Sequence, residues 1–227
     1  MFAFASIQRK AAWLFGSLLG AGLLAGGWYF DHVPAAPPGS AQAASRAVTA
    51  SMHRDVAPVR VRHLAHWAVH SGDSAGMPFV VLDKLDARLF AFDAGGRLRG
   101  SAPVLLGSAV GDVAAVPATP AGRFVTDPLR QAASAGLVWT NPQGELVLHA
   151  PDSQLLPGRA QERFASASQQ DRRISDGSLH VPPAFFHGHL GALRASGSVA
   201  YVLPEQLPLQ QVLGAGAAQA ANLGESL

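Results

Sequence analysis

The residues best suited to chemistry gather in the last third of this 227-residue chain. Ser178 lies close in sequence to Asp176 and His180, and a further histidine, His149, ends an expected strand. A hydroxyl, an imidazole and a carboxylate are the groups of a serine hydrolase, in which histidine removes the serine proton and a carboxylate orients the histidine. Ser178 with either histidine and with Asp176 or Asp152 could supply this set. The Gly-x-Ser-x-Gly turn of many such enzymes is absent, because the residues two before and two after the serine are Asp176 and His180.

Composition excludes several other kinds of chemistry. The chain contains no cysteine, which removes disulfides, cysteine-based zinc sites and thiol nucleophiles. Hydrophobic residues make up 48% of the chain, which is enough apolar material for a folded core. The formal net charge is +2, and Arg9 and Lys10 precede the first acidic residue, so the remainder of the chain is formally neutral. A neutral domain without a long basic run has little electrostatic attraction for nucleic acid, and we expect no nucleic-acid partner.

Two groups of histidines have spacings that could in principle hold a metal ion. They are His63, His66 and His70 on an expected helix, and His180, His187 and His189 near the end of the chain. No carboxylate lies within the first group, and polar residues at such spacings are typical of the solvated side of an amphipathic helix. We therefore expect no metal and no cofactor.

The N-terminal region predicts a membrane segment. Residues 11–30 form an uncharged run of 20 residues, about the length that a helix needs to cross a bilayer core of about 30 Å. Arg9 and Lys10 before it favour a cytoplasmic N-terminus, and Trp13 and Trp28 would lie at the two interfaces. The expected location is the inner membrane, crossed once, with the body of the protein in the periplasm. The alternative is a signal peptide cleaved near residues 41–43.

Glycines within this segment allow a second expectation. Gly16 and Gly20, and again Gly22 and Gly26, have the small-xxx-small spacing that lets two membrane helices approach closely. A dimer through the transmembrane helix is therefore possible, although glycine is frequent in membrane helices in general.

The remainder of the chain reads as a mainly β (α+β) domain with a few helices. We divide the sequence into a cytoplasmic N-terminus (1–10), a transmembrane anchor (11–30), a Pro/Ala linker (31–44), a helical lead-in (45–72), a folded domain (73–206) and a flexible tail (207–227). Pro58 breaks the lead-in, and its second part predicts a helix over 59–70. Strands are predicted over 78–83, 87–92, 97–106, 122–126, 137–140, 145–149 and 199–203, and one helix over 183–194.

Short segments in the folded domain form a recognisable order. They are VVLDK at 80–84, LFAFD at 89–93, Gly107, Gly111-Asp112, TPAGRF at 119–124, Leu148-His149 and RISDGSLHVP at 173–182. In this order they resemble the L,D-transpeptidase (YkuD-type) catalytic domain, over roughly residues 78–204. The TPAGRF run and the closing RISDGSLHVP run are the most specific parts of this resemblance.

The resemblance implies a β-sandwich or barrel with a few helices, and an enzyme that cuts or cross-links peptidoglycan stem peptides through an acyl-enzyme. In this family a cysteine in a Ser-x-Gly-Cys context is the nucleophile and a histidine on an earlier strand is its base. His149 matches the histidine, Gly177 matches the glycine, and Ser178 stands where the cysteine belongs.

The resemblance also suggests how the surrounding loop would be used. It implies that Arg173, Ser175, Asp176, Gly177 and His180 line a substrate site. His180 occupies a position often filled by Arg or Asn in relatives, and Ala150 stands where a glycine commonly follows the base histidine.

The change from cysteine to serine decides the functional expectation. A thiol has a pKa near about 8.5 and a nearby histidine can ionise it, whereas an alcohol is a much weaker acid and needs a base, an orienting carboxylate and an oxyanion hole together. We therefore expect a membrane-anchored, exported L,D-transpeptidase-like protein that is catalytically impaired and is retained for binding peptidoglycan peptides or a cell-wall protein. Two alternatives stay open: an active serine-dependent peptidase or transpeptidase using Ser178 and His149, and a non-catalytic membrane scaffold.

Overall fold

The computed structural model describes residues 56–150 and 159–222, and for residues 221 and 222 only the backbone. The predicted cytoplasmic N-terminus, transmembrane anchor, dimerisation glycines and Pro/Ala linker lie outside these residues. Within them, no helix is both long and apolar enough to cross a membrane.

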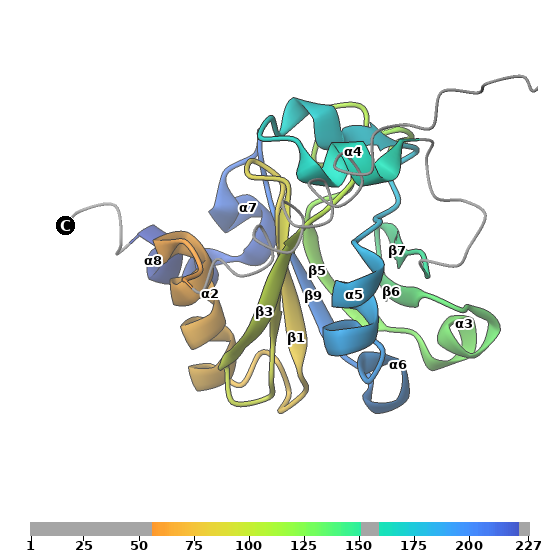
Figure 1. Ribbon diagram of the computed structural model, residues 1–227. Coiled ribbons are helices and arrows are strands. Elements are labelled where there is room, and N and C mark those ends of the chain that lie inside the picture. Colours follow the sequence, from red (N-terminus) through yellow and green to blue (C-terminus); the bar gives the residue numbers. More distant parts are fainter. Residues whose placement is uncertain (1–55, 151–158, 223–227) are drawn as a thin grey trace, which may run out of the picture. The chain divides into compact units, whose positions relative to one another are not determined.

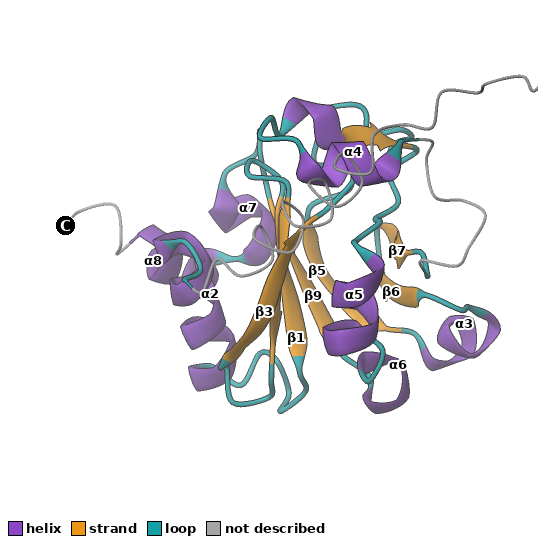
Figure 2. Ribbon diagram, in the orientation of Figure 1, coloured by secondary structure: helices purple, strands orange, loops and turns teal. Residues whose placement is uncertain are grey.

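A seven-stranded sheet forms the centre of the fold (Figures 1 and 2). Its strand order is β3-β2-β1-β9-β5-β6-β7, with β1 and β9 parallel and all other neighbours antiparallel. The strands are β1 Phe79–Asp83, β2 Arg88–Phe92, β3 Leu98–Pro103, β5 Gly122–Thr126, β6 Leu137–Asn141, β7 Gly144–Leu148 and β9 Val199–Leu203. A second, two-stranded sheet pairs β4 Leu106–Gly107 with β8 Arg173–Ser175 in parallel.

Helices cover both faces of the large sheet. On one face lie α2 Val59–His70, α7 Leu209–Leu213 and α8 Ala215–Asn222, and on the other lie α5 Pro183–Phe185, the π-helical turn η2 Phe186–Leu190 and α6 Leu193–Ser196 (Figure 1). The remaining helices are α3 Pro128–Ala133, α4 Ala160–Ala165 and the 3-10 turn η1 Gln170–Arg172.

Burial on both faces explains the weak alternation of the central strands. Every residue of β1, β2 and β9 is buried. In β1, Phe79 and Val81 join the hydrophobic cluster under α2, whereas Val80 and Leu82 join the cluster under α5. A strand covered on both sides has no solvent face to mark with polar residues, so its sequence reads as a continuous apolar run.

The α+β architecture is thus confirmed, with a large and mostly antiparallel sheet, but the expected sandwich or barrel is not what these residues form. The large sheet has two edge strands, β3 and β7, and is therefore open. Helices, rather than a second large sheet, cover its faces in the described part of the chain.

The predicted helix over 183–194 is interrupted. It begins with α5 at Pro183, continues as η2 and, after a turn, ends in α6 at Ser196. Gly188 and Gly191 lie within this stretch, and glycine disfavours a regular helix because it loses more backbone entropy on folding than other residues.

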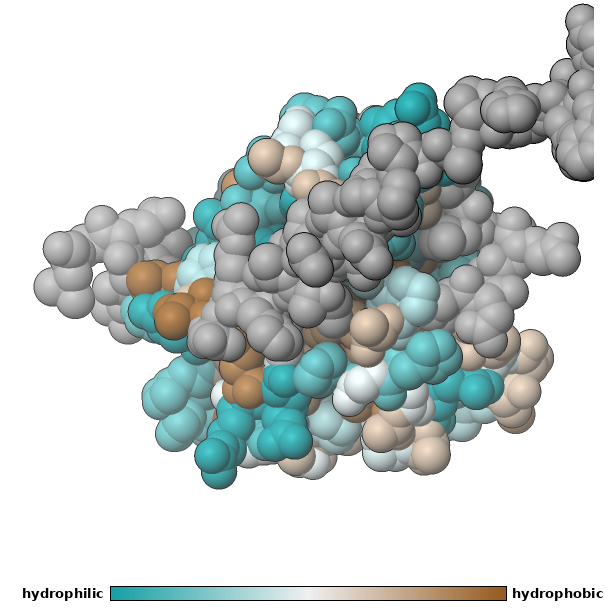
Figure 3. Space-filling model, in the orientation of Figure 1, coloured by the Kyte–Doolittle hydropathy of each residue, from teal (hydrophilic) through white to brown (hydrophobic). Residues whose placement is uncertain are grey.

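The flexible tail predicted from residue 207 is wrong for the residues that the structure describes. The segment forms α7 and α8, and Ala217 in α8 is fully buried against the α2 cluster. His63 Nδ1 on α2 lies 2.8 Å from the Ala220 carbonyl oxygen of α8. The small side chains of α8 let it approach α2 closely. The surface coloured by hydropathy shows apolar residues gathered near these two helices (Figure 3).

Candidate functional site

Three segments distant in sequence meet at the predicted site. The chain after β8 runs between the end of β7 and the residue before β4. His149 N donates to Leu179 O at 2.9 Å, and Leu179 N donates to Val147 O at 2.7 Å. On the other side, Leu105 N donates to His180 O at 2.8 Å and His180 N donates to Leu105 O at 3.1 Å. These backbone bonds place His149 beside the 178–180 segment.

The loop that carries Ser178 is held by its own side chains. Ser175 Oγ donates to Ser178 O at 2.6 Å and accepts from Gly177 N at 3.2 Å. Asp176 Oδ1 accepts from Ser178 N at 3.2 Å and from Ser178 Oγ at 2.6 Å. Serine and aspartate side chains form such short-range turns readily. The loop therefore presents Ser178 in a defined position before any ligand is present.

Gly177 is required by this geometry. Its φ of 115° lies in a region that residues with a side chain rarely adopt, and a Cβ atom there would lie 2.8 Å from Ala118 O. The glycine therefore lets the 175–178 loop pack directly on the backbone of the loop that contains Ala118.

His180 is buried and neutral. It is 3% exposed, and its ring is stacked on that of His149 with centroids 4.9 Å apart. Burial, and secondarily the neighbouring His149, lower the pKa of His180 to about 4, against a smaller opposing effect of Asp176. Its Nε2 lies 3.5 Å from Ser178 Oγ, and its buried Nδ1 has no hydrogen-bond partner among the described residues.

These contacts do not make a complete serine-type catalytic set. The Ser178 hydroxyl donates its proton to Asp176 rather than to a histidine. The hydroxyl and the backbone N–H of Ser178 lower the pKa of the Asp176 carboxyl, which makes Asp176 a poor base. No hydrogen bond in the described part of the chain joins Ser178 to His149, and the Nδ1 of His180 meets no orienting carboxylate there. Asp152, the other candidate carboxylate, lies outside the described residues.

A groove of about 400 Å³ opens beside Ser178. His149, Asp176, Gly177 and Ser178 form one part of its wall, and residues of the loop over 114–120 form another part. Val116 in this loop is 84% exposed. The groove thus offers a few hydrogen-bonding groups within a largely small and apolar surface, which is typical of a peptide or small-molecule site.

Three of the predicted ligand-binding residues do not line this groove, and one of them is the buried His180. Ser175 is buried and holds the backbone of its own loop. The Arg173 side chain is 7% exposed, forms an ion pair with Glu205 and does not line the groove. An arginine in a binding motif and an arginine in a buried ion pair look alike in a sequence, because the partner, 32 residues away, is visible only after folding.

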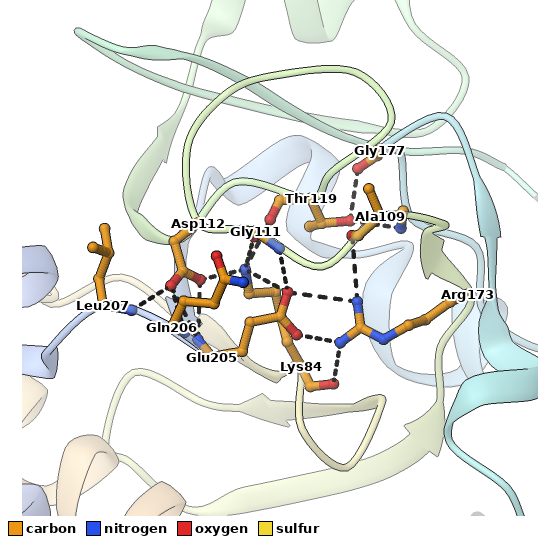
Figure 4. A network of polar contacts seen from close by, with 11 residues as sticks. Lys84, Ala109, Gly111, Asp112, Thr119, Arg173, Gly177, Glu205, Gln206 and Leu207 are labelled. Atoms are coloured by element: carbon orange, nitrogen blue, oxygen red, sulfur yellow. Dashed lines mark hydrogen bonds and ion pairs between the residues drawn. The ribbon is translucent and has the colours of Figure 1, made fainter.

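Arg173 belongs to a buried network that sequence reasoning missed (Figure 4). Lys84, directly after β1, donates through Nζ to Asp112 Oδ1 at 2.6 Å, to Gly111 O at 2.5 Å and to Thr119 O at 2.9 Å. Its Nζ also lies 3.5 Å from Glu205 Oε1. Lys84, Asp112 and Thr119 all fall within the motif segments at 80–84, 111–112 and 119–124. Their place in these segments was the one sequence signal that could have pointed to the network.

The described residues contain no group of three or more His, Asp or Glu side chains arranged to hold a metal ion. His66 and His70 stack on each other at the surface of α2, with centroids 3.7 Å apart. His63 is directed to the α8 backbone instead.

Comparison with known proteins gives limited similarity. No protein-family model matches the chain, and no curated protein matches it. Two solved structures of the helical cell shape determining protein Pgp2 from Campylobacter jejuni are similar to it, each at 13% identity and a TM-score of 0.36. The similarity to the K307A mutant covers 74% of this chain and 64% of that one, and the similarity to the second structure covers 71% and 63%. The chain thus spans less than two thirds of the length of these structures.

Proposed function

We propose that this protein is an exported, membrane-anchored L,D-transpeptidase-like protein that binds peptidoglycan stem peptides, or a cell-wall protein, without efficient catalysis. The observation that carries the proposal is the state of Ser178. Ser178 lines an open groove, but its hydroxyl is hydrogen-bonded to Asp176, and its contact with an imidazole in the described part of the chain, to His180 Nε2, is 3.5 Å long. Binding requires only the shape and the hydrogen-bonding groups of the groove, whereas acyl transfer requires an activated nucleophile.

The first experiment is a reaction of the full chain with a disaccharide-tetrapeptide muropeptide, followed by mass spectrometry. The wild type and the Ser178→Ala variant should give no new product. The Ser178→Cys variant restores a thiol that a histidine can ionise, so products from this variant alone would mean that the missing thiol silences an otherwise intact site. Products from the wild type that disappear in Ser178→Ala would refute the non-catalytic proposal.

Binding is measured by titrating the same muropeptide into the wild type. We expect saturable binding that Val116→Asp weakens about tenfold or more, because it puts a charge on the groove wall. Leu129→Asp is the matched control, since Leu129 is 86% exposed and does not line the groove. Equal binding by both variants, or none by the wild type, would count against a stem-peptide ligand in the groove.

A serine-dependent peptidase or transpeptidase is the second candidate. One contact favours it: a neutral imidazole, His180 Nε2, lies 3.5 Å from Ser178 Oγ. A ligand that displaced Asp176 from the hydroxyl would let this imidazole accept the serine proton. This candidate places the base at His180 rather than at His149, so His180→Phe would abolish any wild-type product while His149→Phe would leave some.

The location and the scaffold alternative depend on residues outside the described part of the chain. Fusion of a reporter enzyme that is active only in the periplasm to the C-terminus tests export, and removal of residues 1–30 tests the anchor. We expect reporter activity in the full chain and its loss on removal of the anchor. A cross-linked dimer that requires Gly16 and Gly20, together with an absence of muropeptide binding, would favour a membrane scaffold.

A further inference from the structure

The buried network of Figure 4 reaches both loops whose residues line the groove. One wall is the loop over 114–120, and Thr119 in this loop accepts from Lys84 through its carbonyl oxygen at 2.9 Å. The Thr119 hydroxyl donates to Gly177 O at 3.0 Å and accepts from Gly107 N at 2.8 Å. Gly177 belongs to the other wall. A single threonine therefore joins the two walls and is itself held by the network.

The second connection runs through Arg173. This residue begins β8, and the Ser175–Ser178 turn follows directly. Its guanidinium pairs with Glu205 and also donates to Lys84 O at 3.3 Å and to Ala109 O at 3.5 Å. The Arg173–Glu205 ion pair thus holds the start of the Ser178 loop. Glu205 also lies beside Lys84, which holds the 114–120 loop through Thr119.

Glu205 contacts both connections, because its carboxylate lies beside Lys84 and Arg173. Its carboxylate pairs with Arg173 and accepts from Gly111 N at 2.8 Å. Its own N–H donates to Asp112 Oδ1 at 3.0 Å, and the next two N–H groups, of Gln206 and Leu207, each donate to Asp112 Oδ2 at 2.7 Å.

The network is closed to water and balanced in charge. The side chains of Lys84, Asp112, Arg173 and Glu205 are between 0% and 7% exposed, and they carry two positive and two negative charges. Burial alone would raise the pKa of Asp112. Hydrogen bonds from Lys84 and from the backbone N–H groups of residues 205–207 hold it below its ordinary value. Removal of one charge from such a set leaves another buried and unpaired, so the loops must move to hydrate it.

We propose that Glu205 is a positioning residue for the Ser178 groove: it contacts no ligand, but it fixes the distance between the two loops that form the groove walls. This inference rests on the proposed function for the biological role of the groove. It also gives the C-terminal segment after β9 a role in the site, which the sequence did not suggest.

The test uses a property of the groove that needs no ligand. In the full chain, the NMR titration midpoint of His180 reports how well the 178–180 segment is buried, and His180→Phe identifies its signal. We expect a wild-type midpoint near 4. Glu205→Gln keeps the shape of the side chain but removes its charge. It should move the midpoint upward by about one pH unit or more, toward the ordinary value of about 6.5.

A matched control separates positioning from general destabilisation. Tyr201→Phe removes another internal hydrogen bond, from the hydroxyl to Asp73 Oδ2 at 2.6 Å, on the α2 side of the sheet. It should leave the His180 midpoint unchanged even where it lowers the thermal midpoint. If Glu205→Gln does not fold, Arg173→Lys takes its place, because lysine keeps the charge but cannot form the bidentate pair with Glu205. The same upward shift of the His180 midpoint is expected.

The proposal is overturned if a folded Glu205→Gln or Arg173→Lys protein keeps the wild-type midpoint. A wild-type midpoint already near the ordinary value would overturn it too, because the segment would then be open with the network intact. Failure of the wild type to bind muropeptide would instead reject the proposed function and leave the positioning role standing. If both hold, Glu205→Gln should also weaken muropeptide binding by about tenfold, and Tyr201→Phe should not.

Discussion

At the scale of single residues, the site is defined by which group holds which proton. The Ser178 hydroxyl donates a hydrogen bond to the carboxylate of Asp176, two residues away. The neighbouring imidazole of His180 stays neutral because it is buried. Both effects are electrostatic and depend on a few ångströms. A cysteine at the same position would carry a thiol, which a histidine ionises far more readily than the alcohol of Ser178, so the Ser178→Cys variant tests the effect of this one atom.

The buried His180 makes stability depend on pH. Its pKa is about 4 in the folded protein and about 6.5 when exposed, so the unfolded chain binds the extra proton first as the pH falls. The contribution to stability is fully present above pH 6.5 and is lost progressively between about pH 6.5 and about pH 4, with a total loss of about 3 kcal/mol. Urea unfolding at several pH values measures it. His180→Phe should flatten the curve in this interval, and an unchanged slope would contradict the burial of a neutral histidine.

Gly177 gives a second prediction at this scale. Gly177→Ala should destabilise the protein by about 1–3 kcal/mol, because the alanine would be strained at a positive φ and its Cβ would meet the Ala118 carbonyl. Gly188→Ala is the control, since a Cβ there meets nothing within 4 Å and φ is not positive. It should be neutral or slightly stabilising. Thermal unfolding of both variants compares them directly, and equal midpoints would show that the loop adapts.

At the scale of elements, α7 and α8 complete the hydrophobic core on the α2 face of the sheet. Leu209 and Leu213 of α7 and Ala217 of α8 pack with the α2 cluster, which also holds Phe79 and Val81 of β1. The alanine-rich composition of α8 is therefore a packing feature: small side chains allow two helix backbones to come close.

A charge at the α2–α8 contact should detach α8. Ala217→Asp would bury a carboxylate without a partner, and we expect a loss of about 2–4 kcal/mol in the free energy of unfolding. Gln219→Asp places the same charge at an exposed position of the same helix and should cost less than about 1 kcal/mol. Chemical denaturation distinguishes them. Similar losses in the two variants would mean that α8 does not dock in solution.

At the scale of the described domain, one sheet separates two hydrophobic clusters, and the polar network lies where four chain segments meet beside it. The segments are the end of β1, the loop between β4 and β5, the start of β8 and the chain after β9. The last of these connects the groove to α7 and α8. One C-terminal segment therefore does two things: α7 and α8 stabilise the α2 face of the sheet, and the residues just before them hold the groove.

Two truncations separate these contributions. A chain ending after Leu207 keeps Glu205 and the three N–H groups on Asp112 but loses α7 and α8, so it should be less stable while keeping a low His180 midpoint. A chain ending after Leu203 loses the network as well, and its His180 midpoint should rise. Urea unfolding and the NMR titration measure the two effects. Equal His180 midpoints in the two truncated proteins would show that the network does not position the groove.

Elements with local signals in the sequence could be predicted with their bounds. The helix over 59–70 follows Pro58, and the strands over 122–126 and 199–203 were bounded by residues that end strands, so all three were predicted with the bounds that the structure has. The closeness of Asp176, Ser178 and His180 was also readable, because these residues are two positions apart. The missing thiol followed directly from composition.

Contacts between residues far apart in the sequence became visible only in the folded chain. The tertiary structure replaced the expected sandwich with an open sheet covered by helices, docked the predicted flexible tail on α2, and removed Arg173 from the groove by pairing it with Glu205. It also buried His180 and thereby fixed its protonation state. Periodicity and turn residues report on a few neighbouring positions, whereas ion pairing, helix docking and desolvation depend on atoms brought together from across the chain.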